Sequence, residues 1–284
     1  MSATTPAPSL TPIVIKIGGA TLEANAAADS LWKTLALQHA RGPGIILVHG
    51  GGKAVDRLLS RLNMPVERRD GIRITPEDQI DEIVGVLNGS TNTTLVGALR
   101  RAGANAVGLS LTDGGTLTCV KATRYSFDAG RVGEVTSADP TLLRTLLQSG
   151  FMPVLSSIGI DASGRALNIN ADDAAAALAT HLRASMLVLM TDVPGVKGAD
   201  GAIVPQLTRM QIDALITAGV VTGGMIPKLR AAADVADASG SPVVILSADN
   251  PAHLAAVVSG GTAGTTILPS VASSSRTTVS EPAR

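Results

Sequence analysis

The sequence predicts an α/β fold: an open, largely parallel sheet with helices on both faces. Short runs of Val, Ile and Leu alternate along the chain with segments of helical periodicity, and several of these runs are apolar on both sides. Strands of that kind are typical of a parallel sheet buried between two helical layers. Hydrophobic residues make up 45% of the chain and aromatic residues only 1%, so we expect a core of Ala, Val, Leu and Ile.

The elements follow one another in a regular order. Strands are predicted at 13–17, 44–49, 105–111, 152–157, 186–191 and 242–247. Helices are predicted between them at 25–40, 52–62, 76–101, 139–149, 171–183, 208–217 and 225–239. Thr75 can cap the long helix and Pro76 suits its first position. Polar segments near 64–74, 116–136 and 159–168 predict hairpins. The ends, 1–11 and 269–284, are rich in Ser, Thr, Pro and Ala and are expected to be disordered tails.

Composition argues against several classes of function. The 23 basic and 23 acidic side chains balance, so there is no basic field for nucleic acid or for an anionic membrane. The few aromatic residues argue against stacking on single-stranded nucleic acid. No apolar run reaches the roughly 18 residues of a membrane span. Cys119 is the only cysteine, which excludes an intrachain disulfide and favours a reducing cytoplasm.

Two glycine clusters follow the first two predicted strands. In "TPIVIKIGGATL", Lys16 stands near the end of an apolar strand and Gly18 and Gly19 come directly after it. A buried ammonium needs an anionic partner. In "HGGGKA", three glycines lead into a helix, whose free amides can bind an anion. Leu47 and Ala54 exclude a P-loop there. Each cluster alone could equally be a tight turn, but together they favour a phosphate site.

Three polar residues are candidates for binding a substrate. Arg73, in "GIRIT", could hold a carboxylate with its planar guanidinium or form a surface salt bridge. Asn168 lies in "ALNINADDAAAALA", before Asp172 and Asp173 at the start of an alanine-rich helix. Asn170 can cap that helix, and one of the two carboxylates could hold a lysine ammonium. Asp192, in "LMTDVPGV", could accept hydrogen bonds from a ribose or belong to an ordinary turn.

Lys228 follows Gly223 and Gly224 and is either a second phosphate lysine or a surface lysine. No Ser-His-Asp or Cys-His set is evident, His49 is interpreted as structural, and no metal-ligand spacing is present. Phosphoryl transfer depends on positioning and positive charge more than on covalent help from the protein. The candidates together suit that chemistry.

The motifs "KIGG", "HGGG", "GIRIT", "NINADDAA", "TDVPGV" and "GGMIPK", in this order, resemble those of the amino-acid kinase family. The resemblance covers about 12–268. It implies a three-layer αβα sandwich, with acceptor binding in an N-lobe at about 12–185 and ATP binding in a C-lobe at about 186–268. The chain is most similar to short bacterial members that phosphorylate N-acetyl-L-glutamate.

The resemblance also implies roles for individual residues. Lys16 and Lys228 would stabilise the transferred phosphoryl group, and Asp172 would hold both lysines. Gly51, Gly52, Arg73 and Asn168 would bind N-acetyl-L-glutamate. The residues bordering ATP would be Gly18, Gly19, Asp192, Val193, Pro194, Gly195, Val196, Lys197, Val220, Val221 and Thr222.

The implied reaction moves the γ-phosphoryl group of ATP to the side-chain carboxylate of N-acetyl-L-glutamate, the second step of arginine biosynthesis. Mg²⁺ would be held mainly by the nucleotide phosphates. The family further implies a homodimer through the helix near 76–101. We expect no feedback by arginine, because residues 1–11 lack the amphipathic pattern of a regulatory helix. Two alternatives are a kinase for N-succinylglutamate or N-acetylaminoadipate, and a catalytically silent regulatory protein of the same fold.

Overall fold

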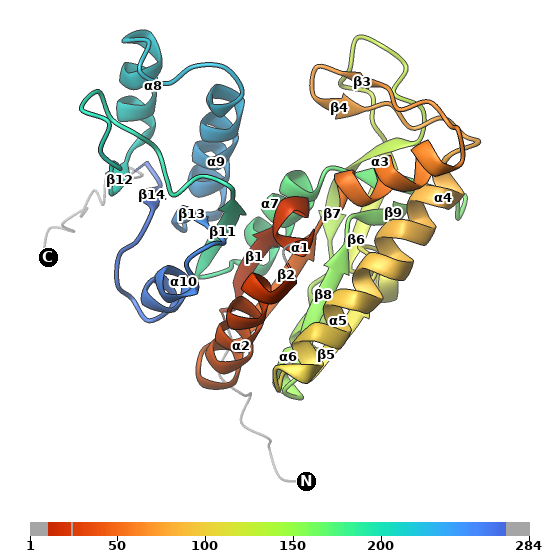
Figure 1. Ribbon diagram of the computed structural model, residues 1–284, viewed down its shortest axis with the longest axis horizontal. Coiled ribbons are helices and arrows are strands. Elements are labelled where there is room, and N and C mark those ends of the chain that lie inside the picture. Colours follow the sequence, from red (N-terminus) through yellow and green to blue (C-terminus); the bar gives the residue numbers. More distant parts are fainter. Residues whose placement is uncertain (1–10, 24, 271–284) are drawn as a thin grey trace, which may run out of the picture.

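The computed structural model describes residues 11–23 and 25–270 (Figure 1). Its centre is one eight-stranded sheet, confirming the predicted α/β class. The strands run in the order β12 (Gln206–Leu207), β14 (Thr265–Ile267), β13 (Val243–Ser247), β11 (Met186–Thr191), β1 (Ile13–Ile17), β2 (Ile45–His49), β8 (Met152–Ser156) and β5 (Ala106–Leu109). Every pair is parallel except β13 with β14.

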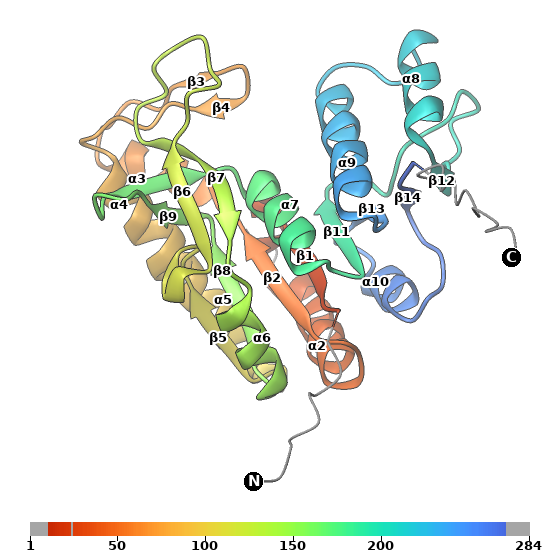
Figure 2. The same ribbon diagram turned by 180° about the vertical axis from the view of Figure 1, so that it is seen from behind.

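Helices cover both faces of the sheet (Figures 1 and 2). One face packs against α2 (Asn25–Arg41), α5 (Asn92–Arg101) and α10 (Pro251–Val258) through a single apolar cluster. The other face packs against α6 (Thr141–Gln148), α7 (Ala171–Leu182), α8 (Arg209–Thr217) and α9 (Met225–Ser239). Alternate side chains of β1 point to opposite faces, so Ile15 joins the first cluster and Val14 the second.

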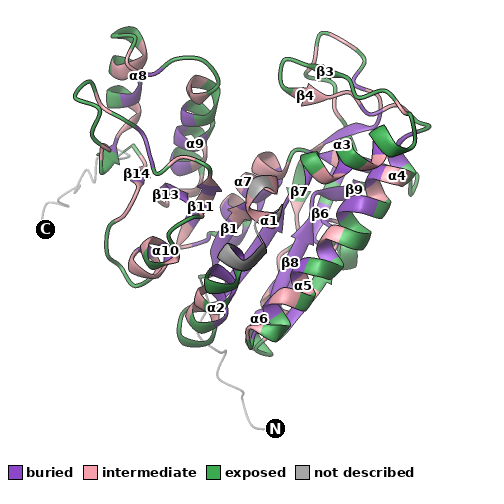
Figure 3. Cartoon of the chain, in the orientation of Figure 1, coloured by how far each residue is buried: buried purple, intermediate pink, exposed green. Residues whose placement is uncertain are grey.

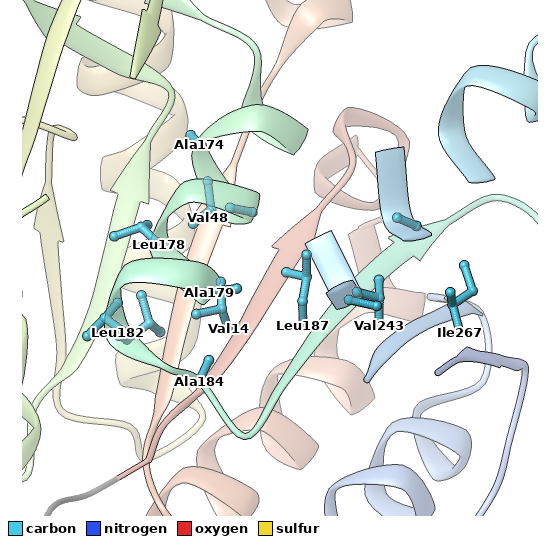
Figure 4. Close-up of a cluster of buried hydrophobic side chains, with 14 of the residues drawn as sticks. Val14, Val48, Ala174, Leu178, Ala179, Leu182, Ala184, Leu187, Val243 and Ile267 are labelled. Carbon is cyan, nitrogen blue, oxygen red and sulfur yellow. The ribbon is translucent and has the colours of Figure 1, made fainter. Parts of the chain in front are cut away.

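Alanines of α7 and α9 take a large part in closing the second face, alongside leucines. Figure 4 shows Val14 and Val48 of β1 and β2 facing Leu178 and Ala179 of α7. The buried alanines allow the helix to approach the sheet closely, which explains how a chain so poor in aromatic residues fills its core. Figure 3 shows the result: the strands are buried, whereas the outer sides of the helices are exposed.

Smaller elements stand at the carboxyl end of the sheet. A second sheet has the order β6 (Leu117–Lys121), β7 (Val132–Ala138), β10 (Ala166–Ile169) and β9 (Ile158–Ile160). A separate hairpin pairs β3 (Arg68–Arg69) with β4 (Ile72–Arg73). The three predicted hairpins are therefore confirmed, with β6–β7 and β9–β10 both antiparallel. Two short helices, α1 (Gly19–Glu23) and α3 (Gly52–Arg61), begin at the glycine clusters.

The long helix predicted at 76–101 begins later than expected. It consists of α4 (Ile80–Val84), a π-helical segment (Gly85–Thr91) and α5. Thr75 does not cap it, because the backbone of Thr75 is bonded to Ala129 and Arg131 of a neighbouring loop. A short 3₁₀ helix (Asp113–Gly115) lies between β5 and β6.

Two other sequence expectations concern the ends of the chain and its division. The predicted tails fall, apart from residues 11 and 269–270, outside the described residues. The expected boundary between the two lobes lies just before β11, and one sheet runs through both parts. None of the helices in the described ranges combines the length and apolar character that crossing a bilayer requires.

Candidate active site

The predicted lysine and aspartate come together at the carboxyl ends of the central strands. Lys16, the fourth residue of β1, lies in register between Val48 of β2 and Leu189 of β11. Its Nζ is 2.9 Å from Oδ1 of Asp172, and its side chain is only 16% exposed. Asp172 explains how an apolar strand can carry a lysine. The ammonium of Lys16 is mostly removed from water, but it is paired with a carboxylate.

Asp172 is fixed by the start of α7. The Asn170 side chain caps this helix, and its Oδ1 accepts hydrogen bonds from the amides of Asp172 (2.8 Å) and Asp173 (3.4 Å). The carboxylates in the first turn also favour the positive end of the helix dipole. Asn170 therefore caps the helix, as one interpretation of the sequence expected. The same cap positions Asp172, whose carboxylate pairs with Lys16.

The two glycine clusters lie against each other. A Cβ placed on Gly19 would stand 3.6 Å from Cα of Gly51, and one placed on Gly51 would come within 2.7 Å of Leu87. A side chain at Gly51 would therefore collide with Leu87, and the glycines let the two turns lie together at the wall of the cavity that Lys16 also lines.

His49 has a structural role, since it does not line the cavity described below. It is fully buried, and Asn92 donates a hydrogen bond of 3.0 Å to its Nε2. Its Nδ1 therefore carries the proton and donates to the carbonyl of Gly50 at 2.8 Å. Burial lowers the pKa of the His49 imidazole, which keeps the ring neutral. The glycine turn is thereby attached to α5.

Arg73 is held from one side only. Its Nη2 donates to Oδ1 of Asp56 (2.5 Å) and to the carbonyl of Gly52 (2.9 Å). Its Nη1 is buried and has no partner among the described residues. A buried donor without a partner is costly, and a ligand carboxylate would satisfy it.

Asp56, on α3, is a functional candidate that the sequence prediction missed. Its second oxygen accepts from Arg68 at 2.7 Å, so it ties both strands of the β3–β4 hairpin to α3. Partial burial opposes ionisation, but the two arginines outweigh it and lower the pKa of the Asp56 carboxyl. Nothing in the local sequence marks Asp56, because its two arginine partners lie 12 and 17 residues away and are brought close by the fold.

Asn168 is positioned by the neighbouring loops. Its Nδ2 donates to Oγ1 of Thr75 at 3.0 Å. The carbonyl of Thr75 accepts from the amide of Arg131, whose buried guanidinium bonds Asp161 at 2.8 Å. The side chain of Asn168 is therefore held at the end of β10, beside the start of α7.

Most of the predicted acceptor-site residues line one cavity of about 260 Å³. Among the predicted site residues, it is lined by Lys16, Gly19, Gly51, Gly52, Arg73, Asn168 and Asp172. Apolar side chains of Val55, Ile72, Ile83 and Leu87 cover part of its wall. Cationic groups and an apolar surface in the same cavity suit an amphipathic anion.

Of the residues predicted to border ATP, only Gly19 lines this cavity. The segment after β11 includes exposed Asp192, Pro194 and Lys197 and buried Gly195 and Val196. Val193 and Val220 are half-buried, Val221 is buried and Thr222 is exposed. Gly18 directly follows β1.

Lys228 is on the first turn of α9 and is exposed. It forms no hydrogen bond or ion pair within residues 11–23 and 25–270, so Asp172 holds Lys16 but not Lys228 in this structure.

Comparisons with known proteins identify the family of the chain. The amino acid kinase family pattern matches residues 11–247. A Pectobacterium carotovorum protein named acetylglutamate kinase is 42% identical over 260 residues, covering 91% of this chain and all of its own length. A solved Streptococcus mutans structure has 31% identity and a TM-score of 0.74, covering 92% of this chain and all of that one. Giardia lamblia carbamate kinase bound to AMP-PNP shares the fold, with a TM-score of 0.68 at 17% identity, over 92% of this chain and 99% of its own. The chain belongs to the amino acid kinase family.

Proposed function

We propose that this protein is a kinase that transfers the γ-phosphoryl group of ATP to the side-chain carboxylate of N-acetyl-L-glutamate. The observation that carries the proposal is one cavity that is lined both by the Lys16–Asp172 pair and by Arg73, whose buried Nη1 has no partner among the described residues. Relatives that match about nine-tenths of the chain at 40–42% identity are named acetylglutamate kinase. The name of these relatives indicates the acceptor. The cavity contains the cationic and amide side chains of Lys16, Arg73 and Asn168, which can bind the carboxylates and the amide of such an acceptor.

The chemistry follows from those groups. Arg73 and Asn168 bind the acceptor, with Nη1 of Arg73 donating to its α-carboxylate. The side-chain carboxylate is ionised at neutral pH and needs no general base. One of its oxygens bonds to the γ-phosphorus while the bond from that phosphorus to the β-phosphate oxygen breaks, and ADP leaves. Lys16 stabilises the charge on the transferred group, and Asp172 holds the ammonium in place.

The second half of the chain has features that fit ATP. The amides at the start of α9 have no side-chain cap, and Gly223 and Gly224 precede them with open space around both. Such a helix start suits phosphates, and Lys228 on its first turn would add charge. Asp192 and the segments 193–197 and 220–222 would border the nucleoside. Mg²⁺ would be held mainly by the nucleotide phosphates, as is usual for this ion at sites of phosphoryl transfer.

Hydroxylamine trapping tests this function. The purified protein is incubated with MgATP and one acceptor at a time: N-acetyl-L-glutamate, N-succinylglutamate, N-acetylaminoadipate, glutamate or aspartate, each with and without arginine. We expect an acyl hydroxamate from N-acetyl-L-glutamate and no inhibition by arginine. Hydroxamate from another acceptor alone would overturn the substrate. No hydroxamate from any acceptor, with ATP still bound, would favour a regulatory protein of the same fold.

We also propose a homodimer through the helical run 80–101. Its outer surface exposes Asp81, Gly85, Asn88, Gly89 and Gly97, and the three glycines have open space where a Cβ would stand. A second helix could approach that surface closely. Sedimentation equilibrium should give twice the 28.7 kDa mass of one chain, and Gly89→Arg should shift the mass towards the monomer. A monomeric wild type would refute the assembly.

A further inference from the structure

A loop between β6 and β7, residues 122–131, carries two of the four aromatic side chains in the protein. The chain has one Trp, one Tyr and two Phe, and Tyr125 and Phe127 lie within this loop. Their rings stack with centroids 5.4 Å apart and planes 25° apart. Neither residue belongs to any of the three apolar clusters of the described core. Their position is therefore not explained by core packing.

The stacked rings connect the hairpin β3–β4 to the loop. The guanidinium of Arg69, on β3, lies 4.7 Å from the centroid of the Phe127 ring. Figures 1 and 2 both show the loop and the hairpin side by side, beyond the carboxyl end of the sheet. Cation–π contacts at such exposed sites are weak individually, so the loop needs a further attachment to stay in place.

Arg124 supplies that attachment. Its guanidinium lies 5.2 Å from the centroid of the Tyr125 ring, and its Nη2 donates to the Tyr125 hydroxyl at 3.0 Å. The same Nη2 pairs with the carboxylate of Asp173, and Nε lies 3.8 Å from Glu134. Contacts thus run without a break from the hairpin, through both rings, to α7.

The point of attachment on α7 matters for the reaction. Asp173 is adjacent to Asp172, and the cap Asn170 bonds both of their amides. The loop is thereby fastened to the helical turn that holds the partner of Lys16. Tyr125 itself lines the cavity, together with Arg73 and Asn168.

We propose that Tyr125 contacts the bound acceptor, and that the Arg124–Asp173 pair is a latch that holds Tyr125 over the cavity. Arg124 and Asp173 are positioning residues, whereas the Tyr125 ring offers apolar surface to the acyl group of an N-acylated amino acid. The proposal rests on the proposed function for the identity of the acceptor. It implies that breaking the latch weakens acceptor binding more than it affects MgATP.

Nitration by tetranitromethane tests the contact without turnover. Tyr125 is the only tyrosine, so nitrotyrosine absorbance reports this residue alone, and Cys119, the other target of the reagent, is buried. Saturating N-acetyl-L-glutamate should slow the nitration several-fold, whereas MgATP alone should leave the rate unchanged. Equal nitration rates with and without the acceptor would overturn the contact.

Steady-state kinetics test the latch. Arg124→Gln and Asp173→Asn should each raise the KM for N-acetyl-L-glutamate by about 5- to 10-fold, as expected for a lost charge-assisted bond at a half-exposed site. The double variant should be no worse than either single one, because both remove the same pair. The KM for MgATP should stay constant. Arg124→Lys should recover part of the loss.

The matched control is Lys121→Gln. It removes an exposed ion pair of the same chain segment, with Asp128 at 3.3 Å, which does not line the cavity. We expect its KM to stay within about twofold of the wild type, as for other exposed pairs. An unchanged acceptor KM in both latch variants, while the wild type turns over N-acetyl-L-glutamate, would overturn the latch and leave the function standing. Turnover of a different acceptor, with protection of Tyr125 by that acceptor, would overturn the substrate and support the Tyr125 contact.

Discussion

Replacing Arg73 by lysine separates two tasks of one side chain. The guanidinium uses Nη2 for Asp56 and the carbonyl of Gly52, while Nη1 stays buried and free for a ligand. A lysine side chain has only one nitrogen, Nζ, in place of the two terminal nitrogens of arginine. Because Asp56 is the nearest carboxylate, we expect that nitrogen to pair with it and to leave the ligand without the second donor.

The size of the effect follows from the missing bond. A hydrogen bond between charged groups contributes about 1.5–3 kcal/mol, and each 1.4 kcal/mol is tenfold in affinity, so the KM for N-acetyl-L-glutamate should rise about 10- to 150-fold. The interaction is made in the ground state as well as in the transition state. The kcat should therefore change much less than the KM.

The assay is hydroxamate formation over a range of acceptor concentrations at saturating MgATP. Arg68→Lys is the matched control: Arg68 binds the other oxygen of Asp56, at 2.7 Å, but its side chain is 43% exposed. We expect it to raise the KM by no more than about threefold. The reasoning fails if Arg73→Lys leaves the acceptor KM unchanged, or if Arg68→Lys has the larger effect.

Three further predictions concern the reaction and the fold. Lys16→Arg and Asp172→Asn should each lower kcat about 100-fold or more in the same assay, since each removes a contact that strengthens in the transition state; near-normal turnover in either would remove that residue from the site. Lys228→Met should lower kcat and raise the KM for MgATP, with the thermal unfolding temperature unchanged; a lower unfolding temperature or a normal kcat would contradict a role in phosphate binding. Gly130→Ala places a Cβ 2.1 Å from a backbone carbonyl at φ 69°, so denaturant unfolding should show a loss of more than about 2 kcal/mol. Gly150→Ala, at φ 77° with open space, should cost only about 1 kcal/mol, and equal losses would mean that the contact has no effect.

The elements that the sequence predicted are those with a strong local pattern. The strands at 13–17 and 186–191 have the predicted bounds, because a continuous apolar run between polar turns leaves little freedom. The start of the helix at Ile80 was missed, because Thr75 is bonded to a loop more than 50 residues away, and no local rule contains that contact. The helix α10 was not predicted either, although its start, Asn250 followed by Pro251 at the first helical position, could have been read from the sequence.

The same distinction applies to the site. Lys16 and Asp172 were predicted because their neighbours, glycines in one case and a capped alanine-rich helix in the other, are unusual in sequence. Arg124 and Asp56 could not be predicted in the same way. Each depends on a partner brought close by the fold, Asp173 for the one and a hairpin strand for the other. An ordinary loop arginine or helix aspartate carries no local mark of such a partner.

The side chains proposed to bind the acceptor are already held by other residues in the structure, whereas the lysine proposed to bind ATP is not. On the acceptor side, the ammonium of Lys16 is already paired and the guanidinium of Arg73 is already oriented before any ligand arrives. Lys228, in contrast, is exposed and unpaired within the described ranges, and fixing a free lysine costs up to about 2 kcal/mol of side-chain entropy. Only a highly charged partner such as a triphosphate offsets that cost. Acceptor binding should therefore be nearly independent of Lys228, so Lys228→Met should leave the protection of Tyr125 by N-acetyl-L-glutamate intact while turnover falls.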